Sequence, residues 1–492
     1  MARATRIPHL HLSRRQLLNT WCAGFGGLAL NALLADQARG ATPQAPELAA
    51  QWSPTAASPL APRAPHFTPT AKRVIFLFMH GGPSHVDTFD PKPQLQKDHG
   101  KPLPFEGTRV KFAKRGNLMK SPWDFKRYGQ NGVPVSELFP EVAGCVDDIC
   151  MIHSLCETNV AHGGATMMMH TGSESLVRPS LGAWLSYGLG TENQSLPAYI
   201  TICPTSLHGG VNNWGAAFLP SIHQGVPYGQ PGYPNSPIKN ARFEYMTNAR
   251  FGSAEQLLQL ELLRSLNGEH LETVGPNSDL DARIQSFELA FRMQTAAPEA
   301  TDISQESAAT RKLYGLDDAT TEDYGQQLLL ARRFAERGVR FIQCTHSRSS
   351  PEQWDQHRGL KEGHERNAAQ IDRPIAGLLK DLKSRGMLDE TLVLWGGEFG
   401  RTPTSEGKDG RDHHPNGFTM WMAGGGVKGG YRHGETDEYG YYAIRDKVTV
   451  HDLHATILYL LGLYHEKLTF RHDGREFRLT DVYGNVARDI IA

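Results

Sequence analysis

The sequence has almost no net charge, because 51 lysine and arginine residues are matched by 52 aspartate and glutamate residues among 492. A formal charge of −1 provides no basic surface for nucleic acid or anionic lipid, so we expect neither as a partner. Cysteine is scarce, with six residues and no Cys-x-x-Cys pair, which excludes a zinc knuckle. We expect buried thiols, and one disulfide within residues 145–156 is the alternative.

An apolar run long enough for a comfortable membrane span is also missing. The segment from Trp21 to Leu34 is mildly apolar, but it is short and contains three glycines. It follows Arg14-Arg15 and precedes small residues at 38 and 40, with the spacing that a signal peptidase reads. Residues 1–40 therefore resemble a twin-arginine signal peptide, which predicts a periplasmic or secreted protein with the twin-arginine export machinery as a partner. A short helix with a chance arginine pair is the alternative.

The rest of the chain predicts a linker followed by one α/β domain. Residues 41–70 are rich in proline and alanine and predict the linker. Beyond them, apolar runs typical of buried parallel strands alternate with segments whose apolar residues recur three and four apart. The runs are 73–79, 149–152, 198–203, 339–345, 391–395 and 419–423, and the helical segments are 253–266, 278–294, 320–337, 364–384 and 451–461. We expect residues 71–492 to form a mostly parallel sheet sandwiched by helices, with an insertion around 204–250.

Four polar clusters follow predicted strands, where open α/β sheets bind their ligands. The first comes directly after 73–79 and contains His80 and Asp87. Glycines at 81 and 82 allow a sharp turn or a close approach to a ligand. We interpret His80 or Asp87 as a metal ligand. A loop held by turn hydrogen bonds is the alternative.

The second cluster is a glycine-rich turn that opens a helix, with His162 and Thr166 at its start. Free backbone N–H groups and the helix dipole make such a turn a good site for an anion. We expect His162 or Thr166 to lie near the atom that is attacked in a reaction. The alternative is a packed helix start, in which methionines 167–169 fill the core.

The third cluster follows the strand at 339–345 and contains Asp355, His357 and His364. Aspartate and histidine two residues apart on a loop can bind one cation, and this ligand set suits zinc or manganese better than calcium or magnesium. We expect Asp355 and His357 to be metal ligands. His364 begins a long amphipathic helix, where it could equally be a surface residue.

The fourth cluster is the most specific and follows the strand at 391–395. Glu398 stands at the strand end, Arg401 comes three residues later, and His413 lies in a nearby Gly-Arg-Asp-His sequence. We interpret Glu398 and His413 as metal ligands and Arg401 as a clamp for an anionic group. A surface ion pair explains any one of these residues, but four such clusters after strands favour a site.

Together these motifs resemble the DUF1501 family, whose members are similar in fold to alkaline phosphatases and sulfatases. The motifs are His-Gly-Gly-Pro-Ser-His-x-Asp-Thr-Phe-Asp-Pro-Lys at 80–92, Trp-Asp-x-His at 354–357, Gly-Glu-Phe-Gly-Arg-Thr-Pro at 397–403 and Gly-Arg-Asp-His at 410–413. The resemblance covers nearly everything from residue 72 onward. It implies an alkaline-phosphatase-like fold and one or two divalent metal ions, with zinc, manganese, calcium and magnesium all open.

The resemblance also implies roles for individual residues. Glu398 corresponds to a late aspartate ligand of the superfamily, and His413 corresponds to the last histidine ligand. Phe399 replaces a residue that is usually histidine or asparagine. At the position of the usual nucleophile this chain has His162, and Thr166 is the nearest hydroxyl.

The predicted function is metal-dependent hydrolysis of a phosphate or sulfate ester in a small molecule or glycan. A non-catalytic, metal-containing protein that binds sulfated or phosphorylated glycans is the main alternative, and the departures at His162 and Phe399 favour it. A metalloenzyme of another reaction type, such as a transferase or an isomerase, is the second alternative.

Overall fold

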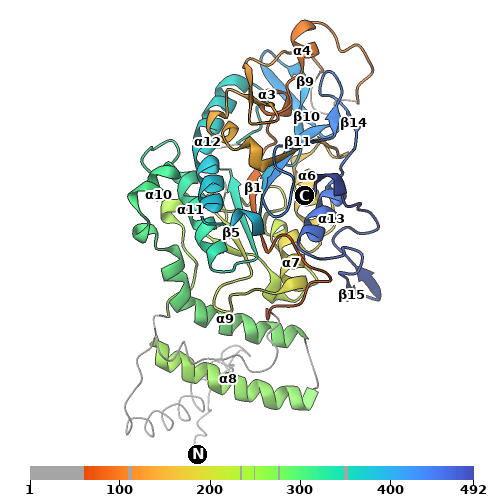
Figure 1. Ribbon diagram of the computed structural model, residues 1–492. Coiled ribbons are helices and arrows are strands. Elements are labelled where there is room, and N and C mark those ends of the chain that lie inside the picture. Colours follow the sequence, from red (N-terminus) through yellow and green to blue (C-terminus); the bar gives the residue numbers. More distant parts are fainter. Residues whose placement is uncertain (1–59, 109–113, 233–234, 249, 275–277, 348–352) are drawn as a thin grey trace, which may run out of the picture. The chain divides into compact units, whose positions relative to one another are not determined.

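The structure is a computed structural model that describes residues 60–492, apart from 109–113, 233–234, 249, 275–277 and 348–352 (Figure 1). The predicted signal peptide and residues 41–59 of the predicted linker lie outside the described residues. The chain divides into two compact units, one of residues 1–55 with 247–277 and one of residues 56–246 with 278–492. The first unit contributes helix α8 (Ser253–Val274), and every other helix and strand named below belongs to the second.

An eight-stranded sheet forms the centre of the second unit. Its strands, in spatial order, are β12 (Arg432–His433), β4 (Ile149–Leu155), β11 (Phe418–Ala423), β8 (Thr391–Gly396), β1 (Arg73–Met79), β7 (Phe341–His346), β5 (Tyr199–Ile202) and β6 (Val226–Tyr228). All neighbours run parallel except β11, which is antiparallel to both β4 and β8. The predicted class, an α/β fold with a mostly parallel sheet, is confirmed, and all six predicted strands are found in it.

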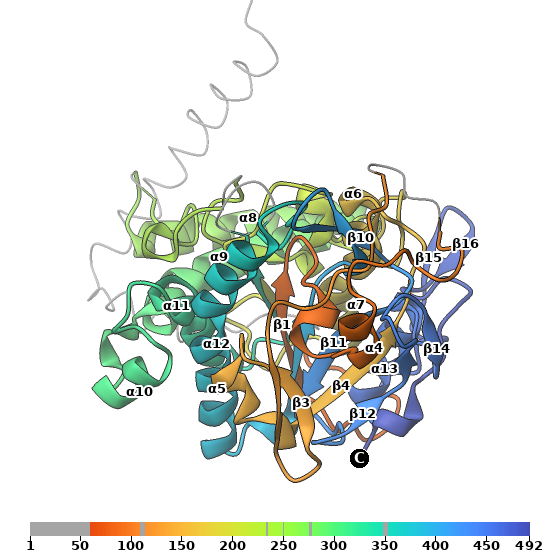
Figure 2. The same cartoon turned by 90° about the horizontal axis from the view of Figure 1, so that it is seen from above.

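Helices cover both faces of this sheet. The α-helices of the second unit are α3 (His85–Thr88), α4 (Pro93–Lys97), α5 (Pro140–Ala143), α6 (His162–Thr171), α7 (Leu181–Leu189), α9 (Ser278–Thr301), α10 (Ala308–Leu313), α11 (Glu322–Glu336), α12 (Leu360–Ser384) and α13 (Val450–Leu460) among the described residues. In Figures 1 and 2, α11 and α12 lie on one side of β1, and α6, α7 and α13 lie on the other.

Strand β1 is apolar at every position after its first residue because both of its faces are buried. Ile75 and Leu77 belong to a core cluster with residues of α11 and α12, whereas Phe76 and Phe78 belong to a cluster with residues of α7 and α13. Alternate side chains of a strand point to opposite faces, so a strand in the middle of a three-layer sandwich needs apolar residues at every position.

Four small hairpins complete the second unit. They are β2 (Phe125–Tyr128) with β3 (Val133–Ser136), β9 (Gly400–Glu406) with β10 (Gly410–His414), β13 (Glu435–Thr436) with β14 (Ala443–Arg445), and β15 (Phe470–His472) with β16 (Arg475–Phe477). The predicted insertion at 204–250 is not wholly separate from the sheet, because its strand β6 pairs with β5 at the sheet edge.

The five cysteines of the described residues are all free thiols, and four of them are buried. The expectation of buried thiols is therefore met, and the alternative of a disulfide within residues 145–156 is not. No helix in the described part of the chain is long and apolar enough to cross a bilayer.

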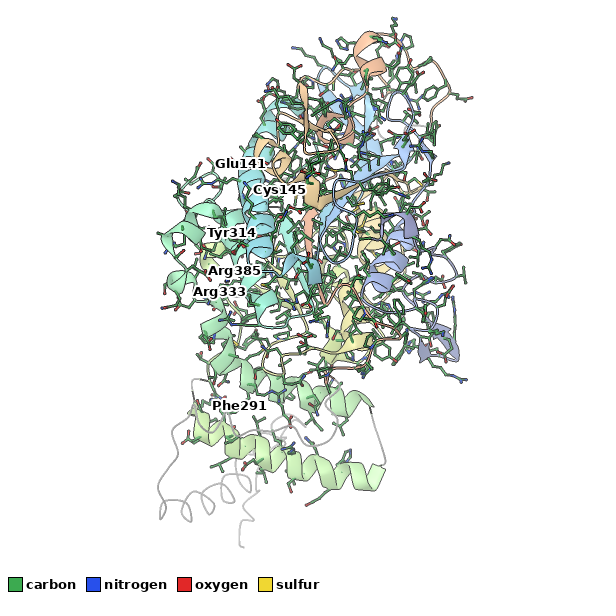
Figure 3. All side chains as sticks on the ribbon, viewed as in Figure 1. Glu141, Cys145, Phe291, Tyr314, Arg333 and Arg385 are labelled. Atoms are coloured by element: carbon green, nitrogen blue, oxygen red, sulfur yellow. The ribbon has the colours of Figure 1, made fainter. Side chains whose placement is uncertain are left out.

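A buried polar network joins α11 to α12. Oδ2 of Asp381 accepts a hydrogen bond from the Tyr314 hydroxyl (2.9 Å) and lies 3.0 Å from Nε of Arg332, and Oδ1 accepts from Nε of Arg385 (2.7 Å). Figure 3 labels Tyr314, Arg333 and Arg385 in this region. Such a network has few alternative arrangements once its groups are paired, so it fixes how the two helices pack.

Candidate metal centre

The loop after β1 approaches the segment at Asp355 very closely. Gly81 has a φ of +108°, and a Cβ atom there would lie 2.7 Å from the backbone nitrogen of Trp354 and 2.8 Å from that of Asp355. Only glycine combines this backbone conformation with this contact. The carbonyl of His80 accepts a hydrogen bond from the N–H of Trp354 (3.1 Å), so the loop and the Asp355 segment are held together.

The β9–β10 hairpin brings the fourth predicted cluster to the same place. Arg401 and His413 are direct partners across its two strands. A Cβ atom on Gly410 would lie 1.9 Å from the carbonyl oxygen of His357, so glycine is needed for the hairpin to pack against that loop. The loop that carries Asp355 and His357 is therefore in direct backbone contact with the hairpin that carries Arg401 and His413.

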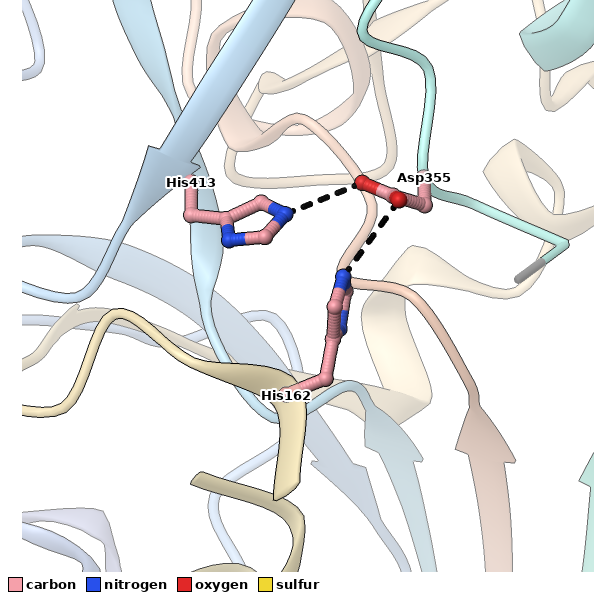
Figure 4. Close-up of side chains that lie close together, drawn as sticks. All are labelled: His162, Asp355 and His413. Carbon is pink, nitrogen blue, oxygen red and sulfur yellow. Dashed lines mark hydrogen bonds and ion pairs between the residues drawn. The ribbon is translucent and has the colours of Figure 1, made fainter. Parts of the chain in front are cut away.

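Asp355 is the centre of the arrangement. Its Oδ1 lies 3.1 Å from Nε2 of His357 and 3.1 Å from Nε2 of His413, and its Oδ2 lies 3.4 Å from Nε2 of His162. Figure 4 shows His162 and His413 converging on the Asp355 carboxylate. The His357 side chain is 32% exposed, whereas the other three side chains are at most 10% exposed. The cluster is therefore buried but open to solvent on the His357 side.

Each of the three imidazoles has its other nitrogen, Nδ1, engaged with a protein acceptor. The pairs are His162 with Oε1 of Glu398 (2.7 Å), His413 with the carbonyl oxygen of Val160 (2.7 Å), and His357 with Oε2 of Glu406. Because a carbonyl or a carboxylate can only accept, each Nδ1 carries the proton. The Nε2 atoms are thereby set toward Asp355, which is how proteins prepare histidines to bind a metal.

Burial and the neighbouring carboxylates act in opposite directions on these imidazoles. Burial lowers the pKa of His162, but hydrogen bonds to Asp355 and Glu398 outweigh burial and raise the pKa to about 9. Burial dominates at His413 and lowers its pKa to about 4. Asp355 raises the pKa of His357. His162 therefore carries a proton beside Asp355 at neutral pH, and a divalent cation that takes its place would release that proton.

Two overlapping groups of these side chains have the geometry of a metal site. His162, Asp355 and His413 form one group, and His357, Asp412 and His413 form the other, with ligand atoms within 4.8 Å of one another in each. The structure thus brings together four sequence-predicted residues, His162, Asp355, His357 and His413, which stand on α6, on a loop and on β10. A candidate metal site is present, and the identity of the ion is a matter for proposal.

Phe399 forms an apolar wall of this cluster. Its ring centroid lies 4.9 Å from that of His162 and 4.7 Å from that of His413. The ring of His208, a residue that the sequence did not single out, lies 5.1 Å from His162 on a further side. Aromatic rings packed around an imidazole restrict its rotation, so these contacts keep Nε2 aimed at Asp355.

Glu398 and Arg401 have different positions from those that the sequence predicts. Glu398 accepts a hydrogen bond from the N–H of Gly81 (2.9 Å) besides its bond to His162, and it belongs to neither of the two groups. Arg401 is fully buried and lies 2.6 Å from Oδ1 of Asp355. It also donates to the carbonyls of Gly81 and Gly82. Its guanidinium therefore orients Asp355 and does not face an incoming anion.

Asp87 and His80 also lie outside the two metal groups. Both carboxylate oxygens of Asp87 bind Arg411, at 2.6 and 3.1 Å. Burial raises the pKa of Asp87, but the Arg411 guanidinium outweighs burial and lowers it. Nδ1 of His80 lies 3.1 Å from Oγ of Ser347. The predicted ligand role of Asp87 is corrected to a buried ion pair, because both of its oxygens face Arg411 and it lies in neither group of converging ligand atoms.

Thr166 lies one turn after His162 on α6. It is fully buried, and its hydroxyl has no hydrogen-bond partner among the described residues. His364, which the sequence left open as a surface residue, is completely buried, and its Nε2 accepts a hydrogen bond from the N–H of Ser84 (3.1 Å). Sequence reasoning missed Glu406, which lies in the same hairpin as Arg401 and His413 and is the cross-strand partner of Gly410.

A family model described as "Protein of unknown function (DUF1501)" matches residues 71–491. The chain belongs to the DUF1501 family. No curated protein matches the chain. The matched range includes all of the sheet and every residue of the candidate metal centre.

Solved structures that resemble the chain are distant. One is a sulfatase from Pseudoalteromonas sp., with 12% identity, a TM-score of 0.34, and coverage of 87% of this chain and 73% of the other. Another is an alkaline phosphatase from the Antarctic bacterium TAB5, with 10% identity, a TM-score of 0.32, and coverage of 80% and 99%. A third is a phosphonate monoester hydrolase from Silicibacter pomeroyi, with 13% identity, a TM-score of 0.33, and coverage of 66% and 68%. Likeness at this level says nothing about the activity of this chain.

Proposed function

We propose that this DUF1501 protein is an exported, metal-dependent hydrolase of phosphate or sulfate esters in small molecules or glycans. The observation that supports the proposal is the convergence of three Nε2 atoms on the carboxylate of Asp355, with every Nδ1 engaged by a protein acceptor. Imidazoles whose Nδ1 atoms are fixed by protein acceptors and whose Nε2 atoms point at one carboxylate are typical of a cation site.

The donor set favours a transition metal. Three imidazole nitrogens and one carboxylate suit zinc or manganese, whereas calcium and magnesium prefer a shell of oxygen atoms. In this proposal His162, His357, His413 and Asp355 hold the ion, and Asp412 is a further acidic group beside His357 and His413. A bound divalent cation supplies Lewis-acid polarisation of an ester oxygen and lowers the pKa of water.

The protein's own residues would position this chemistry. Arg401 holds Asp355 from one side, and Glu398 holds His162 from the other. Substrate would enter from the side of His357, since this is the most exposed of the three imidazoles. Thr166 and His162 remain the candidates for a group close to the attacked atom, with Thr166 offering a hydroxyl that has no protein partner in the described part of the chain.

The first test measures metal content and ester turnover on the same purified protein. We expect zinc or manganese near one equivalent or above by elemental analysis. We also expect hydrolysis of p-nitrophenyl phosphate or p-nitrophenyl sulfate that is lost after chelation and recovered when the metal is returned. Turnover that survives complete removal of metal would contradict the proposal, and so would a chain that takes up no metal at all.

One observation favours a second candidate, a non-catalytic metal-containing protein that binds sulfated or phosphorylated glycans. The Arg401 guanidinium, which the sequence assigns to an anionic substrate, is occupied by Asp355 and backbone carbonyls. Without that arginine the centre has less positive charge to stabilise the transition state of an anionic ester. Protein that holds its metal yet turns over none of a panel of aryl and sugar esters is the result expected of this candidate.

Export is a separate part of the proposal and has its own test. Replacing Arg14 and Arg15 together with lysine is expected to leave the protein in the cytoplasm, because the twin-arginine pathway reads the arginine pair and not its charge. Cell fractionation with immunoblotting measures the distribution. The matched control changes Arg3 and Arg6 to lysine, which alters the same residue type outside the pair and should leave export intact. Equal export of both variants would disprove the twin-arginine route.

A further inference from the structure

A large polar pocket lies apart from the candidate metal centre, and nothing described so far uses it. Its volume is about 810 Å³, and none of the residues that line it belongs to the two metal groups. The lining comes from α4 and from strands β2, β3, β4, β12, β13 and β14. Figure 2 shows α4, β3, β12 and β14 in one part of the molecule. A pocket of this size is in the range of sites that bind small organic ligands.

Two of the acidic side chains of the pocket are neutralised by cations of the protein. Four acids line it. Asp90 lies 2.9 Å from Nζ of Lys92, and Glu435 pairs with Arg445. Asp437 accepts hydrogen bonds from three backbone N–H groups, at 2.8 to 3.0 Å. These N–H groups are neutral, so Asp437 keeps its negative charge, and Glu438 has no cationic partner among the described residues.

The cationic side chains are less fully paired. Of the five lysines and arginines that line the pocket, Lys97 and Arg432 have no acidic partner within the described chain, and Arg127 donates only to the neutral carbonyl of Gly132 (3.0 Å). Three cations thus face two acids, Asp437 and Glu438, which leaves an excess of one positive charge. Arginines left with unused donors are suited to carboxylate, sulfate and phosphate groups, which they can bind with two parallel hydrogen bonds.

The inner wall of the pocket offers neutral hydrogen-bonding groups. His153 on β4 is 6% exposed, and its Nδ1 lies 3.1 Å from Oγ1 of Thr419. Burial lowers the pKa of His153 to about 4, so the imidazole is neutral at ordinary pH. Tyr431 adds an aromatic ring with a hydroxyl. A neutral imidazole and a tyrosine suit a ligand rich in hydroxyl groups.

We propose that this pocket binds an oligosaccharide carrying acidic substituents, with Arg127 and Arg432 pairing with those substituents and the His153 wall facing sugar hydroxyls. The pocket's size, its excess of unpaired cations and its polar wall fit a ligand that is anionic and hydroxylated at once. The choice of a glycan rests on the proposed function, in which a glycan ester is a substrate. The charge argument stands independently of the metal centre.

The test measures binding of size-fractionated dextran sulfate oligosaccharides to the full chain by calorimetry. Unsulfated dextran of the same length and inorganic sulfate are the comparison ligands. Replacing Arg127 and Arg432 together with alanine is expected to weaken dextran sulfate binding by about tenfold or more. Both arginines are exposed, so the fold should be unaffected, and thermal melting verifies this. Arg471→Ala is the matched control, because Arg471 is an exposed arginine on β15, away from the pocket.

Dextran sulfate binding that is unchanged in the double variant would overturn the proposal. Equal binding of neutral dextran would overturn the claim that the arginines recognise acidic substituents. If inorganic sulfate competes fully at the same sulfate concentration, the pocket binds small anions and the proposal of an oligosaccharide ligand is wrong. Asp355→Asn should leave dextran sulfate binding intact. Loss of turnover with retained glycan binding therefore separates failure at the metal centre from failure at this pocket.

Discussion

Asp355→Asn is expected to lower the affinity of the chain for zinc or manganese by more than about 100-fold, because it removes the one carboxylate on which three imidazoles converge. The amide keeps the shape of the side chain and an oxygen that can accept from Arg401, which lies 2.6 Å from Asp355. It provides no negative charge to balance a dication. Ester turnover should fall with the metal, by a factor of about 1,000 or more if hydrolysis depends on the ion.

Competition with a chromophoric chelator measures this affinity, and elemental analysis after gel filtration measures the metal retained. The matched control is Asp473→Asn, since Asp473 also lies near a histidine, 3.4 Å from His472, but on the exposed surface. Metal binding at full strength in Asp355→Asn, with a normal melting temperature, would show that the cluster is a hydrogen-bonded structural unit. The proposed hydrolase would then lack a metal site.

The sheet and its rim could be predicted from the sequence because their signals are local. The strand at 73–79 is apolar at every position, as burial on both faces requires. Polar residues in the loops after such strands lie at the carboxyl edge of a parallel sheet, where ligands bind. That rule places Asp355 and Glu398 together although neither is near the other in the sequence, and the structure has both within hydrogen-bonding distance of His162.

Which arginine pairs with which aspartate could not be predicted in the same way. Asp87 binds Arg411, and Arg401 binds Asp355. Both arginines come from the β9–β10 hairpin, whose register shifts between residues 411 and 413. A shift of this kind changes which side chains face the sheet, and it has no signature in the sequence. A pattern of acids, histidines and arginines therefore indicates a site without showing which residues are ligands and which neutralise one another.

Glu398→Gln tests whether a residue that touches no ion in this scheme still controls metal binding. Glu398 holds the Nδ1–H of His162 at 2.7 Å. Glutamine can keep the hydrogen bond from Gly81, but it accepts more weakly at His162 and can turn its NH₂ group toward that nitrogen. The imidazole loses its fixed orientation and part of its basicity, so metal affinity is expected to fall about 10- to 100-fold.

A second readout of the same variant is the pKa of His162 in the metal-free chain. Glu398 and Asp355 together raise this pKa to about 9 against the effect of burial. With one of the two carboxylates gone, the pKa should move down toward its ordinary value, which NMR titration of the imidazole can follow. Glu390→Gln is the control, because Glu390 forms an exposed ion pair with Lys72 at 2.7 Å and no contact with histidine. If the pKa of His162 falls while metal affinity stays the same, Glu398 acts on the proton alone and His162 is not a ligand. If both fall together, the carboxylate sets the imidazole for the metal.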